Sequence, residues 1–295
     1  MSIIINGVSF TYMKKTPYEK KALDNISLEI KDGEIQGIIG HTGSGKSTLI
    51  QHINGLIKLQ EGTITVGDIA LTNKKRPKPK YSVLRSEVGM VFQYPEYQLF
   101  EETVEKDVAF GPKNLKIPKE EIAERVKEAI EVVGLDYESV KNRSPFELSG
   151  GQKRRVAIAG VLAMKPKILI LDEPTAGLDP SGRKEMYELI RRVKETCTPT
   201  IVIISHNMDE IADFADRIAV LDKGKLAYNL PPKELFTHKE ELYKMGLELP
   251  LVVRLENYLK EKNIDLGANA ISQDELVKAI VAYKLAKARG GSYAE

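Results

Sequence analysis

The stretch GHTGSGKS at residues 40–47 decides the fold. It matches the pattern G-x-x-x-x-G-K-[ST], whose glycines let backbone N–H groups curl inward around phosphate oxygens. The apolar run Ile35–Ile39 precedes it, and Ser47–Ile53 follows with the composition of a helix start. A strand, a phosphate-binding loop and a helix are therefore expected in that order. A flexible glycine loop before a helix is the alternative, and the flanking strand and helix argue against it.

Every residue of this loop is a candidate for contact with a nucleotide. Lys46 is expected to pair with the β- and γ-phosphates of ATP, and Ser47 to offer its hydroxyl to Mg²⁺. The other candidates for nucleotide binding in this segment are Gly40, His41, Thr42, Gly43, Ser44, Gly45 and Thr48. ATP and Mg²⁺ are the substrate and cofactor that this composition predicts.

A second motif places two carboxylates at the end of an apolar run. Ile168–Leu171 reads as a buried strand, and Asp172 and Glu173 follow it directly. In a parallel sheet such residues reach the carboxyl edge, where nucleotides bind. Asp172 is expected to hold Mg²⁺, and Glu173 to act as general base toward the attacking water. A plain acidic helix cap is the alternative for this pair.

The sequence LSGGQ at residues 148–152 narrows the class of NTPase. A Ser-Gly-Gly turn that opens a helix gives the chain a second anion-binding helix terminus. One phosphate tail has little use for two such termini from the same subunit. The residues of this turn that we expect to contact nucleotide are Ser149, Gly150, Gly151 and Gln152.

With these three motifs the sequence resembles the ATP-binding cassette (ABC) family over roughly residues 3–236. In that family two subunits dock head to tail, so the LSGGQ turn of one closes over the phosphate loop of the other. The resemblance implies that Tyr12 stacks on adenine and that Gln93 senses Mg²⁺ and the attacking water. It also implies that Asp179 lies in a loop that reaches across the dimer and that His206 contacts the γ-phosphate.

Two of these residues have a plain structural alternative. Tyr12 could be an ordinary tyrosine on the surface of a strand, and His206 could be a histidine packed in the core. Of the 4 histidines, His206 is the one that directly follows an expected strand, Ile201–Ile204, at the nucleotide edge. Glu173, His206 and Gln93 are therefore the catalytic candidates.

A narrower resemblance lies in the segments QYPEYQLFEETV at 93–104 and DVAFGP at 107–112. They are similar to energy-coupling-factor (ECF) transporters, which import vitamins and metal ions, and residues 40–42 and 144–147 look like the second of their two A-type ATPase subunits. This implies as partners a second A-type ATPase subunit, a transmembrane T subunit and a substrate-binding membrane S subunit. It also makes residues 98–100 candidates for coupling, whereas a neutral reading makes Leu99 and Phe100 ordinary core.

The pattern of apolar runs predicts an α/β P-loop NTPase with an antiparallel β subdomain and a helical subdomain. Expected strands cover 3–5, 8–10, 26–30, 35–39, 64–66, 69–71, 168–171, 201–204, 218–221 and 226–228. Ile122, Val126, Ile130 and Val133 recur on one helix face that Gly134 can end, and 181–195 reads as another helix. We expect an ATP-binding domain over 1–239, with its helical subdomain at about 94–165.

Residues 240–295 are expected to form a small helical appendage with a possible role in dimer contact. Two capping boxes, Thr237 with Glu240 and Ser272 with Glu275, each open an expected helix. The apolar positions Leu251, Leu255, Tyr258 and Leu259 have the spacing of a packed helix face. That packing could lie within the chain or between chains. The segment Tyr228–Pro231 departs from the usual family pattern, which has a glycine before the proline pair.

Composition limits the remaining possibilities. Lys+Arg 44 and Asp+Glu 42 leave a formal net charge of +2, which predicts no dominant attraction for nucleic acid. A single cysteine, Cys197, excludes an internal disulfide, and no apolar run approaches the ~20 residues of a membrane span. We expect a peripheral protein at the cytoplasmic face of the cell membrane, in contact with the membrane only through partners. The basic segment Lys74–Lys80 is expected to be a solvated loop.

Three other classes compete with a transport ATPase. An ABC ATPase that acts on DNA or ribosomes usually has two cassettes or a long coiled-coil insertion, and neither is seen. A small-molecule kinase would share the phosphate loop but have no use for the LSGGQ turn. A structural subunit without catalysis would not need Glu173 and His206, which are both present.

Overall fold

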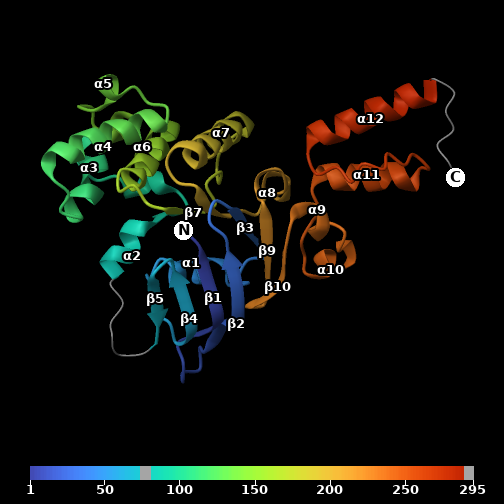
Figure 1. The fold of residues 1–295 in the computed structure, drawn as a ribbon, viewed down its shortest axis with the longest axis horizontal. Helices are drawn as coiled ribbons and strands as arrows, with labels where there is room; N and C mark the ends of the chain where they lie inside the picture. Colours follow the sequence, from blue (N-terminus) through green and yellow to red (C-terminus); the bar gives the residue numbers. More distant parts are fainter. Residues whose placement is uncertain (74–80, 289–295) are drawn as a thin grey trace.

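The computed structural model describes residues 1–73 and 81–288. In this part of the chain ten strands form two sheets, and helices cover the larger one (Figure 1). The basic segment Lys74–Lys80 lies outside the described residues, so its expected loop conformation stays a prediction. None of the helices within the described ranges is both long and apolar enough to cross a membrane.

The larger sheet contains Ile35–Ile39, the strand that the phosphate loop follows. Its spatial order is β10-β9-β3-β8-β7-β6, with β10 antiparallel to β9 and the other neighbours parallel. The strands are β3 (Ile35–Ile39), β6 (Val88–Val91), β7 (Ile168–Asp172), β8 (Thr200–Ile204), β9 (Arg217–Asp222) and β10 (Lys225–Leu230). The central strands β3 and β8 are buried along their whole length, because both faces of this sheet are covered.

The two faces belong to two separate cores. Leu169 and Leu171 on β7 face the helices, whereas Ile168 and Ile170 face the smaller sheet. Ile170 is fully buried. This alternation follows from the period of two along a strand. The sheet is thus held on both sides, which fixes the positions where its strands end.

The smaller sheet is antiparallel and has the order β2-β1-β4-β5. Its strands are β1 (Ile3–Tyr12), β2 (Lys20–Ile30), β4 (Glu61–Val66) and β5 (Ile69–Thr72). The sequence predicted two short strands where β1 is continuous. Gly7 at φ +58° introduces an irregularity between Ile5 and Val8, but pairing with β2 continues on both sides of it.

One helix, α1 (Lys46–Ile53), lies between the two sheets, and the helices that follow β6 form a lobe. The lobe contains η1 (Pro95–Gln98), α3 (Val104–Asn114), α4 (Lys119–Val132), α5 (Tyr137–Val140), η2 (Pro145–Glu147) and α6 (Gly150–Leu162). Figure 1 shows it to one side of the sheets, with α11 and α12 at the opposite end of the molecule. The remaining helices are α2 (Tyr81–Glu87), α7 (Pro180–Thr196), α8 (Met208–Phe214), α9 (Pro232–Leu235), α10 (Lys239–Lys244), α11 (Leu251–Glu261) and α12 (Gln273–Ala288).

Most expected elements agree with the structure to within a few residues. The helix that Gly134 was expected to end is α4, and Gly134 has φ +78° just beyond its C-cap. The helix expected over 181–195 is α7. No sequence pattern predicted α2 or the start of α3, which begins where the Thr103 side chain accepts from the Lys106 N–H.

The appendage differs from expectation at one of its two caps. The Ser272 hydroxyl accepts from the Glu275 N–H at 3.3 Å, as a cap of α12 should. The proposed cap at Thr237 is wrong, because its hydroxyl donates to the Glu234 carbonyl at 2.7 Å and α10 begins after His238. Thr237 therefore ends the preceding helix α9 and does not start the next one.

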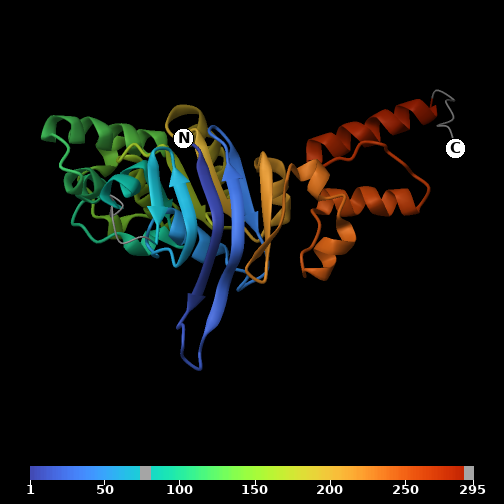
Figure 2. The same cartoon turned by 60° about the horizontal axis from the view of Figure 1, so that its bottom comes forward.

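The expected apolar face of α11 is not packed within this chain. Leu251, Leu255 and Tyr258 are 53%, 40% and 55% exposed, whereas Val252 is the buried residue of the helix. Figure 2 shows α11 and α12 projecting as a pair from the body of the molecule. The residues that the structure describes therefore do not bury these three side chains, and packing between chains stays a prediction.

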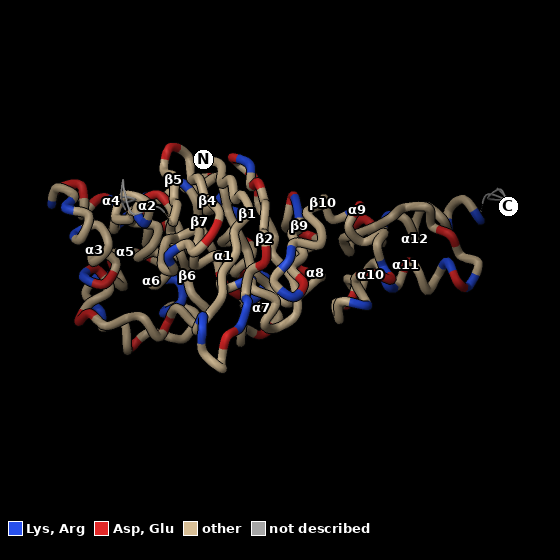
Figure 3. The backbone as a smooth tube through the Cα atoms, turned by 90° about the horizontal axis from the view of Figure 1, so that it is seen from below, with Lys and Arg blue, Asp and Glu red and all other residues tan. Residues whose placement is uncertain are grey.

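Positively and negatively charged residues are interspersed along the described part of the chain. Figure 3 shows Lys and Arg positions interspersed with Asp and Glu positions along the backbone of the body and of the appendage. This agrees with the formal net charge of +2.

We predict that Ser272→Ala loosens α12, because the cap accepts one of the otherwise unpaired N–H groups of its first turn. The expected loss is about 1 kcal/mol in the opening free energy of α12, measured by amide hydrogen exchange. Thr237→Ala is the control and should leave α10 unchanged. Equal effects of the two changes on their following helices would contradict the assignment of caps.

Candidate functional site

The candidate site lies at the carboxyl edge of the larger sheet. β3, β6, β7 and β8 run parallel and end side by side at this edge. The residues that follow them are the phosphate loop after β3, Gln93 after β6, Glu173 after β7 and His206 after β8. Asp172 pairs with Ile204 in the β7–β8 register, so the ends of these two strands are level. Residues from four distant parts of the sequence therefore meet in one place.

Glycine is required at two positions of the phosphate loop. Gly40 has φ +148°, and a Cβ there would lie 2.2 Å from the Leu221 carbonyl oxygen. Gly45 has φ +107°, and a Cβ there would lie 2.5 Å from the Ala22 carbonyl oxygen. Both contacts are with backbone, which cannot move aside cheaply, so the loop can approach β2 and β9 only without side chains at these positions.

The loop holds buried side chains that are hydrogen-bond donors. Lys46 is 6% exposed, and its ammonium donates to the Gly40 and His41 carbonyls at 2.7 and 3.0 Å. Ser44 is fully buried, and its hydroxyl has no hydrogen-bond partner among the described residues. The N–H groups of the first turn of α1 have no acceptor within the helix. This set of donors fits the oxygens of a phosphate chain.

Gln93 and His206 hold the Glu173 carboxylate between them. Gln93 Nε2 donates to Glu173 Oε2 at 3.0 Å, and His206 Nε2 lies 2.5 Å from Glu173 Oε1. Glu173 is 19% exposed at the side chain and His206 is 51% exposed. The three catalytic candidates thus form one connected cluster, and His206 is not packed in the core.

Burial and charge set the protonation of the groups beside this cluster. Burial raises the pKa of Asp172 to about 6, and the neighbouring Glu173 carboxylate adds to that effect, while Lys46 and His206 oppose it. Burial lowers the pKa of Lys46, against the attraction of the Glu173 and Asp172 charges. The edge of the sheet is therefore a poorly solvated place in which a few charges interact strongly.

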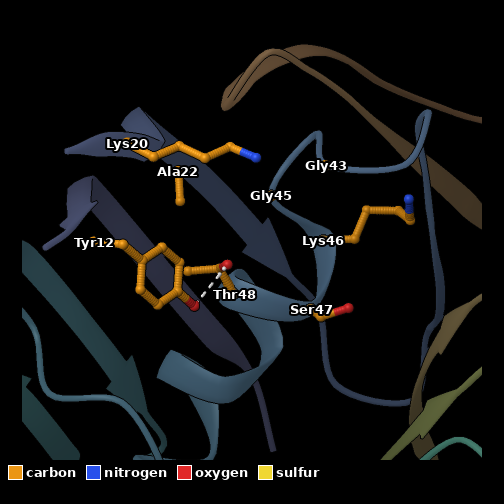
Figure 4. A pocket seen from close by; sticks show the side chains of 8 residues that line it. All are labelled: Tyr12, Lys20, Ala22, Gly43, Gly45, Lys46, Ser47 and Thr48. Atoms are coloured by element: carbon orange, nitrogen blue, oxygen red, sulfur yellow. Dashed lines mark hydrogen bonds between the residues drawn. The ribbon is translucent and has the colours of Figure 1, made fainter. Parts of the chain in front are cut away.

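A cavity lies beside the phosphate loop (Figure 4). Its lining residues are Tyr12, Lys20, Ala22, Gly43, Gly45, Lys46, Ser47 and Thr48. Tyr12 is 38% exposed, and its hydroxyl is hydrogen-bonded to Thr48 Oγ1 at 3.2 Å. Figure 4 shows the Tyr12 ring at one end of the cavity and the Ser47 and Lys46 side chains at the other.

Sequence reasoning missed two residues of this cavity. Lys20 and Ala22 on β2 line it, and Lys20 Nζ lies near Gly43 of the phosphate loop. Both belong to a strand that carries no motif, so only the pairing of β2 with β1 brings them to the nucleotide side. The one signal in the sequence is that Lys20 and Ala22 are two positions apart and so share one face of a strand. This spacing is too common to predict a binding site.

The LSGGQ turn is built as expected but stands apart from the phosphate loop of its own chain. Ser149 and Gln152 form a capping box at the start of α6, with Ser149 Oγ accepting from the Gln152 N–H at 3.3 Å. A Cβ at Gly150 or Gly151 would meet nothing within 4 Å. Neither this turn nor Asp179 lines the cavities that contain the phosphate loop in the described chain.

Asp179 has a local role in this structure. Its carboxylate accepts from the Gly182 N–H at 2.7 Å and caps α7, and Pro180 follows at the first helical position. The residues of the site therefore fall into two sets: one around the phosphate loop, and one formed by the LSGGQ turn and the start of α7.

A buried arginine connects these two sets. Arg154 on α6 is 3% exposed and makes a two-pronged ion pair with Glu96 of η1, at 3.0 and 2.9 Å. Its Nη1 also donates to the carbonyls of Pro174 and Ala176, in the loop after Glu173. Burial alone would raise the pKa of Glu96, but the hydrogen bonds and charge of Arg154 outweigh it and lower that pKa.

Candidate magnesium ligands also lie at this edge. Ser47 is the second residue of α1, Asp172 ends β7, and Gln93 follows the neighbouring strand β6. Hydroxyl, amide and carboxylate oxygens are the donors that Mg²⁺ takes when phosphates complete its shell. The donor set therefore fits Mg²⁺ bound together with a nucleotide.

The chain is similar to known proteins over most of its length. The ABC transporter family model matches residues 23–176. The energy-coupling factor transporter ATP-binding protein EcfA2 of Clostridium tetani is 52% identical over 281 residues, covering 95% of this chain and 96% of that protein. Its counterpart in Clostridioides difficile is 49% identical over 291 residues, covering 98% and 99%.

Two solved structures share the architecture. CbiO1 from Clostridium perfringens, described as part of the ABC transporter complex CbiONQ, has a TM-score of 0.72 and 39% identity, covering 86% of this chain and 98% of that one. The ATP-binding cassette MJ0796, described as a dimeric post-hydrolysis state bound to ADP and Pi, has a TM-score of 0.67 and 31% identity, covering 78% and 98%.

We predict that Arg154→Met strongly destabilises the protein, because it leaves the Glu96 carboxylate partly buried without a cation. The expected loss in the free energy of unfolding is roughly 3–5 kcal/mol, measured by denaturant titration at pH 7. The double variant Glu96→Gln with Arg154→Met should lose less than Arg154→Met alone, since no unpaired charge remains.

The same pair fixes the sign of a pH effect. Because the pKa of Glu96 is lowered from 4.5, its contribution is present above that pH and is lost as the pH falls further. A single variant as stable as wild type at pH 7 would contradict the importance of the ion pair.

Proposed function

The chain belongs to the ABC transporter family, among the ATP-binding subunits of energy-coupling factor transporters, and on that premise we propose how its residues bind and hydrolyse ATP. It is an ATPase that powers an energy-coupling factor importer. The observation that carries the assignment of residues is the Glu173 carboxylate, held between Gln93 and His206 at the edge where Lys46 lies.

ATP binds with its phosphates along the phosphate loop. The loop N–H groups and the Ser44 hydroxyl replace water as hydrogen-bond donors to the phosphate oxygens. Lys46 exchanges its bonds to the Gly40 and His41 carbonyls for bonds to the β- and γ-phosphates. Adenine stacks on Tyr12, whose hydroxyl is held by Thr48. These groups are aligned before the substrate arrives, so little reorganisation is needed.

Hydrolysis depends on one water placed in line with the γ-phosphate. Glu173 accepts a proton from this water, and Gln93 and His206 keep its carboxylate oriented. When bound, Mg²⁺ neutralises charge on the β- and γ-phosphate oxygens, and Ser47, Gln93 and Asp172 would hold it. Positioning and electrostatic stabilisation carry most of the rate acceleration in phosphoryl transfer.

A second subunit completes the site. The Ser149–Gly151 turn and Asp179 are separate from the phosphate loop of their own chain, so they serve the nucleotide of a neighbour in a head-to-tail dimer. The exposed N-terminus of α6 then meets the γ-phosphate from the opposite side. The neighbour is a second A-type ATPase subunit, either a copy of this chain or a related chain.

Coupling to the membrane partner involves the groove beside η1. Gln98, Leu99 and Phe100 all line it, together with apolar side chains of α3 and α6. Leu99 is 7% exposed and belongs to the core, whereas Phe100 is 57% exposed and stacks edge-on against Phe110 at 4.9 Å. Phe100 is thus available to a helix of a transmembrane T subunit, whereas the buried Leu99 is not.

The remaining partners follow from the family. A substrate-binding membrane S subunit recognises the imported vitamin or metal ion, and this chain lies at the cytoplasmic face of the cell membrane through its contact with the T subunit. An ABC ATPase of another transporter class is the second candidate. Copurification of a T and an S subunit from detergent-solubilised membranes supports the first, and copurified ribosomes or DNA would contradict both.

We predict that Glu173→Gln abolishes ATP turnover while ATP binding is retained, because the amide keeps the size of the side chain but cannot accept the proton. Steady-state phosphate release and nucleotide affinity are the measurements, and a closed dimer should accumulate with ATP. Undiminished hydrolysis by this variant would refute Glu173 as the base.

We predict that Ser149→Arg spoils the neighbour's site and leaves its own ATP binding intact. The arginine removes the cap of α6 and fills the space that the turn leaves open. A dimer with Ser149→Arg in one subunit and Lys46→Ala in the other places both defects in one shared site and leaves the second site intact. A dimer with both changes in the same subunit places one defect in each site, so it should be the less active of the two. A normal turnover rate from dimers with Ser149→Arg in both subunits would rule out sharing across the interface.

A further inference from the structure

Glu173 has an unusual backbone. Its φ is +51°, in the left-handed region that residues with a side chain rarely adopt, so surrounding contacts must hold it there. Its N–H donates to the Ile204 carbonyl at 2.9 Å, and its own carbonyl accepts from the Ala176 N–H at 3.1 Å. The first contact ties Glu173 to β8. The second depends on where the following loop lies.

That loop is anchored by a side chain of α8. Thr175 is 8% exposed, and its hydroxyl donates to Glu210 Oε2 at 3.0 Å. The Tyr187 hydroxyl on α7 donates to the same oxygen at 2.5 Å. Burial and the neighbouring carboxylate raise the pKa of Tyr187, so the phenol stays a donor throughout the physiological range. One carboxylate oxygen therefore collects two hydroxyl donors from two different elements.

Glu210 belongs to the helix that starts just after His206. Asn207 caps this helix, and its Oδ1 accepts from the Asp209 and Glu210 N–H groups at 3.1 and 3.3 Å. The Glu210 carboxylate thus joins the segment after His206 to the segment after Glu173. The two catalytic side chains face each other at 2.5 Å, and their downstream segments are fastened to each other as well.

Arg154 fixes the same loop from the other side. Its Nη1 donates to the Pro174 carbonyl at 3.2 Å and to the Ala176 carbonyl at 3.0 Å, on either side of Thr175. The backbone of the loop is held by Arg154, and its one buried hydroxyl side chain is held by Glu210. Without the hydroxyl contact, the loop keeps its main-chain anchors but loses the link that sets its position relative to α8.

We propose that Glu210, acting through Thr175, is a positioning residue for the Glu173 carboxylate. The inference rests on the proposed role of Glu173 as general base. Glu210 does not touch ATP or the water in this arrangement. It sets the loop that keeps Glu173 left-handed and its carboxylate between Gln93 and His206. A shift of about 1 Å in a reacting group can cost on the order of a hundredfold in rate.

The test compares Thr175→Val with Thr175→Ser in the assembled transporter. Valine has the shape of threonine but no hydroxyl, whereas serine keeps the donor to Glu210. We expect Thr175→Val to lower kcat by about tenfold to about a hundredfold, with KM for ATP and nucleotide affinity unchanged. Thr175→Ser should restore most of the rate. Tyr187→Phe, which removes the second donor, should lower kcat in the same direction and serves if Thr175→Val does not fold.

Thr198→Val is the matched control for a purely structural effect. Thr198 is fully buried, and its hydroxyl donates to the Pro166 carbonyl at 3.0 Å, away from the site. We expect this variant to lower the melting temperature about as much as Thr175→Val and to leave kcat unchanged. A fall in kcat that simply follows the melting temperature across both variants would overturn the proposal, and so would a normal kcat for Thr175→Val.

Glu173→Gln, measured in parallel, separates the two levels of the argument. If it abolishes turnover while Thr175→Val does not lower kcat, the positioning role alone is wrong. If Glu173→Gln hydrolyses ATP normally, the assigned base is wrong and the positioning role falls with it.

Discussion

The functional site depends on one geometric constraint: parallel strands of a single sheet end at the same edge. β3, β7 and β8 are neighbours in register, with Asp172 opposite Ile204, so whatever follows them is brought together. The phosphate loop, Glu173 and His206 each follow one of these strands. Both faces of the sheet are buried in separate cores, which leaves its strand ends little freedom to shift. Gln93 and Glu173, which are 80 residues apart in the sequence, therefore approach to hydrogen-bond distance.

Polar contacts then refine what the sheet places. Glu173 adopts a left-handed conformation that its own sequence does not favour, and the surrounding loop pays for it through bonds to Arg154 and Glu210. Arg154 also pairs with Glu96 beside the groove that we assign to the membrane partner. A movement of η1 or α6 would reach the loop after Glu173 through a single buried guanidinium. Arg154 thus stabilises the chain and also links the groove beside η1 to the loop that follows Glu173.

Errors of the sequence analysis came from local rules that a neighbouring element overrode. Thr237 has the spacing of a helix cap, but its hydroxyl donates to the Glu234 carbonyl in the last turn of α9 and so does not cap α10. The apolar spacing of α11 correctly indicated a helix, yet it could not say what covers Leu251 and Tyr258, which this chain leaves exposed. The periodicity indicates that a helix face is apolar, but it does not indicate which partner covers that face.

The residues proposed to bind phosphate and to act on water could be predicted from three contiguous segments: the loop at 40–47, the pair Asp172–Glu173 and the turn at 149–151. Such motifs are local because phosphate binding and strand-end carboxylates need only short fixed spacings. The sequence also predicted most strands and the helices α4 and α7. The sequence did not indicate that Lys20 lines the cavity beside the phosphate loop or that Glu210 contacts Thr175, and these contacts are visible only in the folded chain. Such contacts join elements whose separation along the chain carries no signal, since they arise from sheet order and helix packing and not from local pattern.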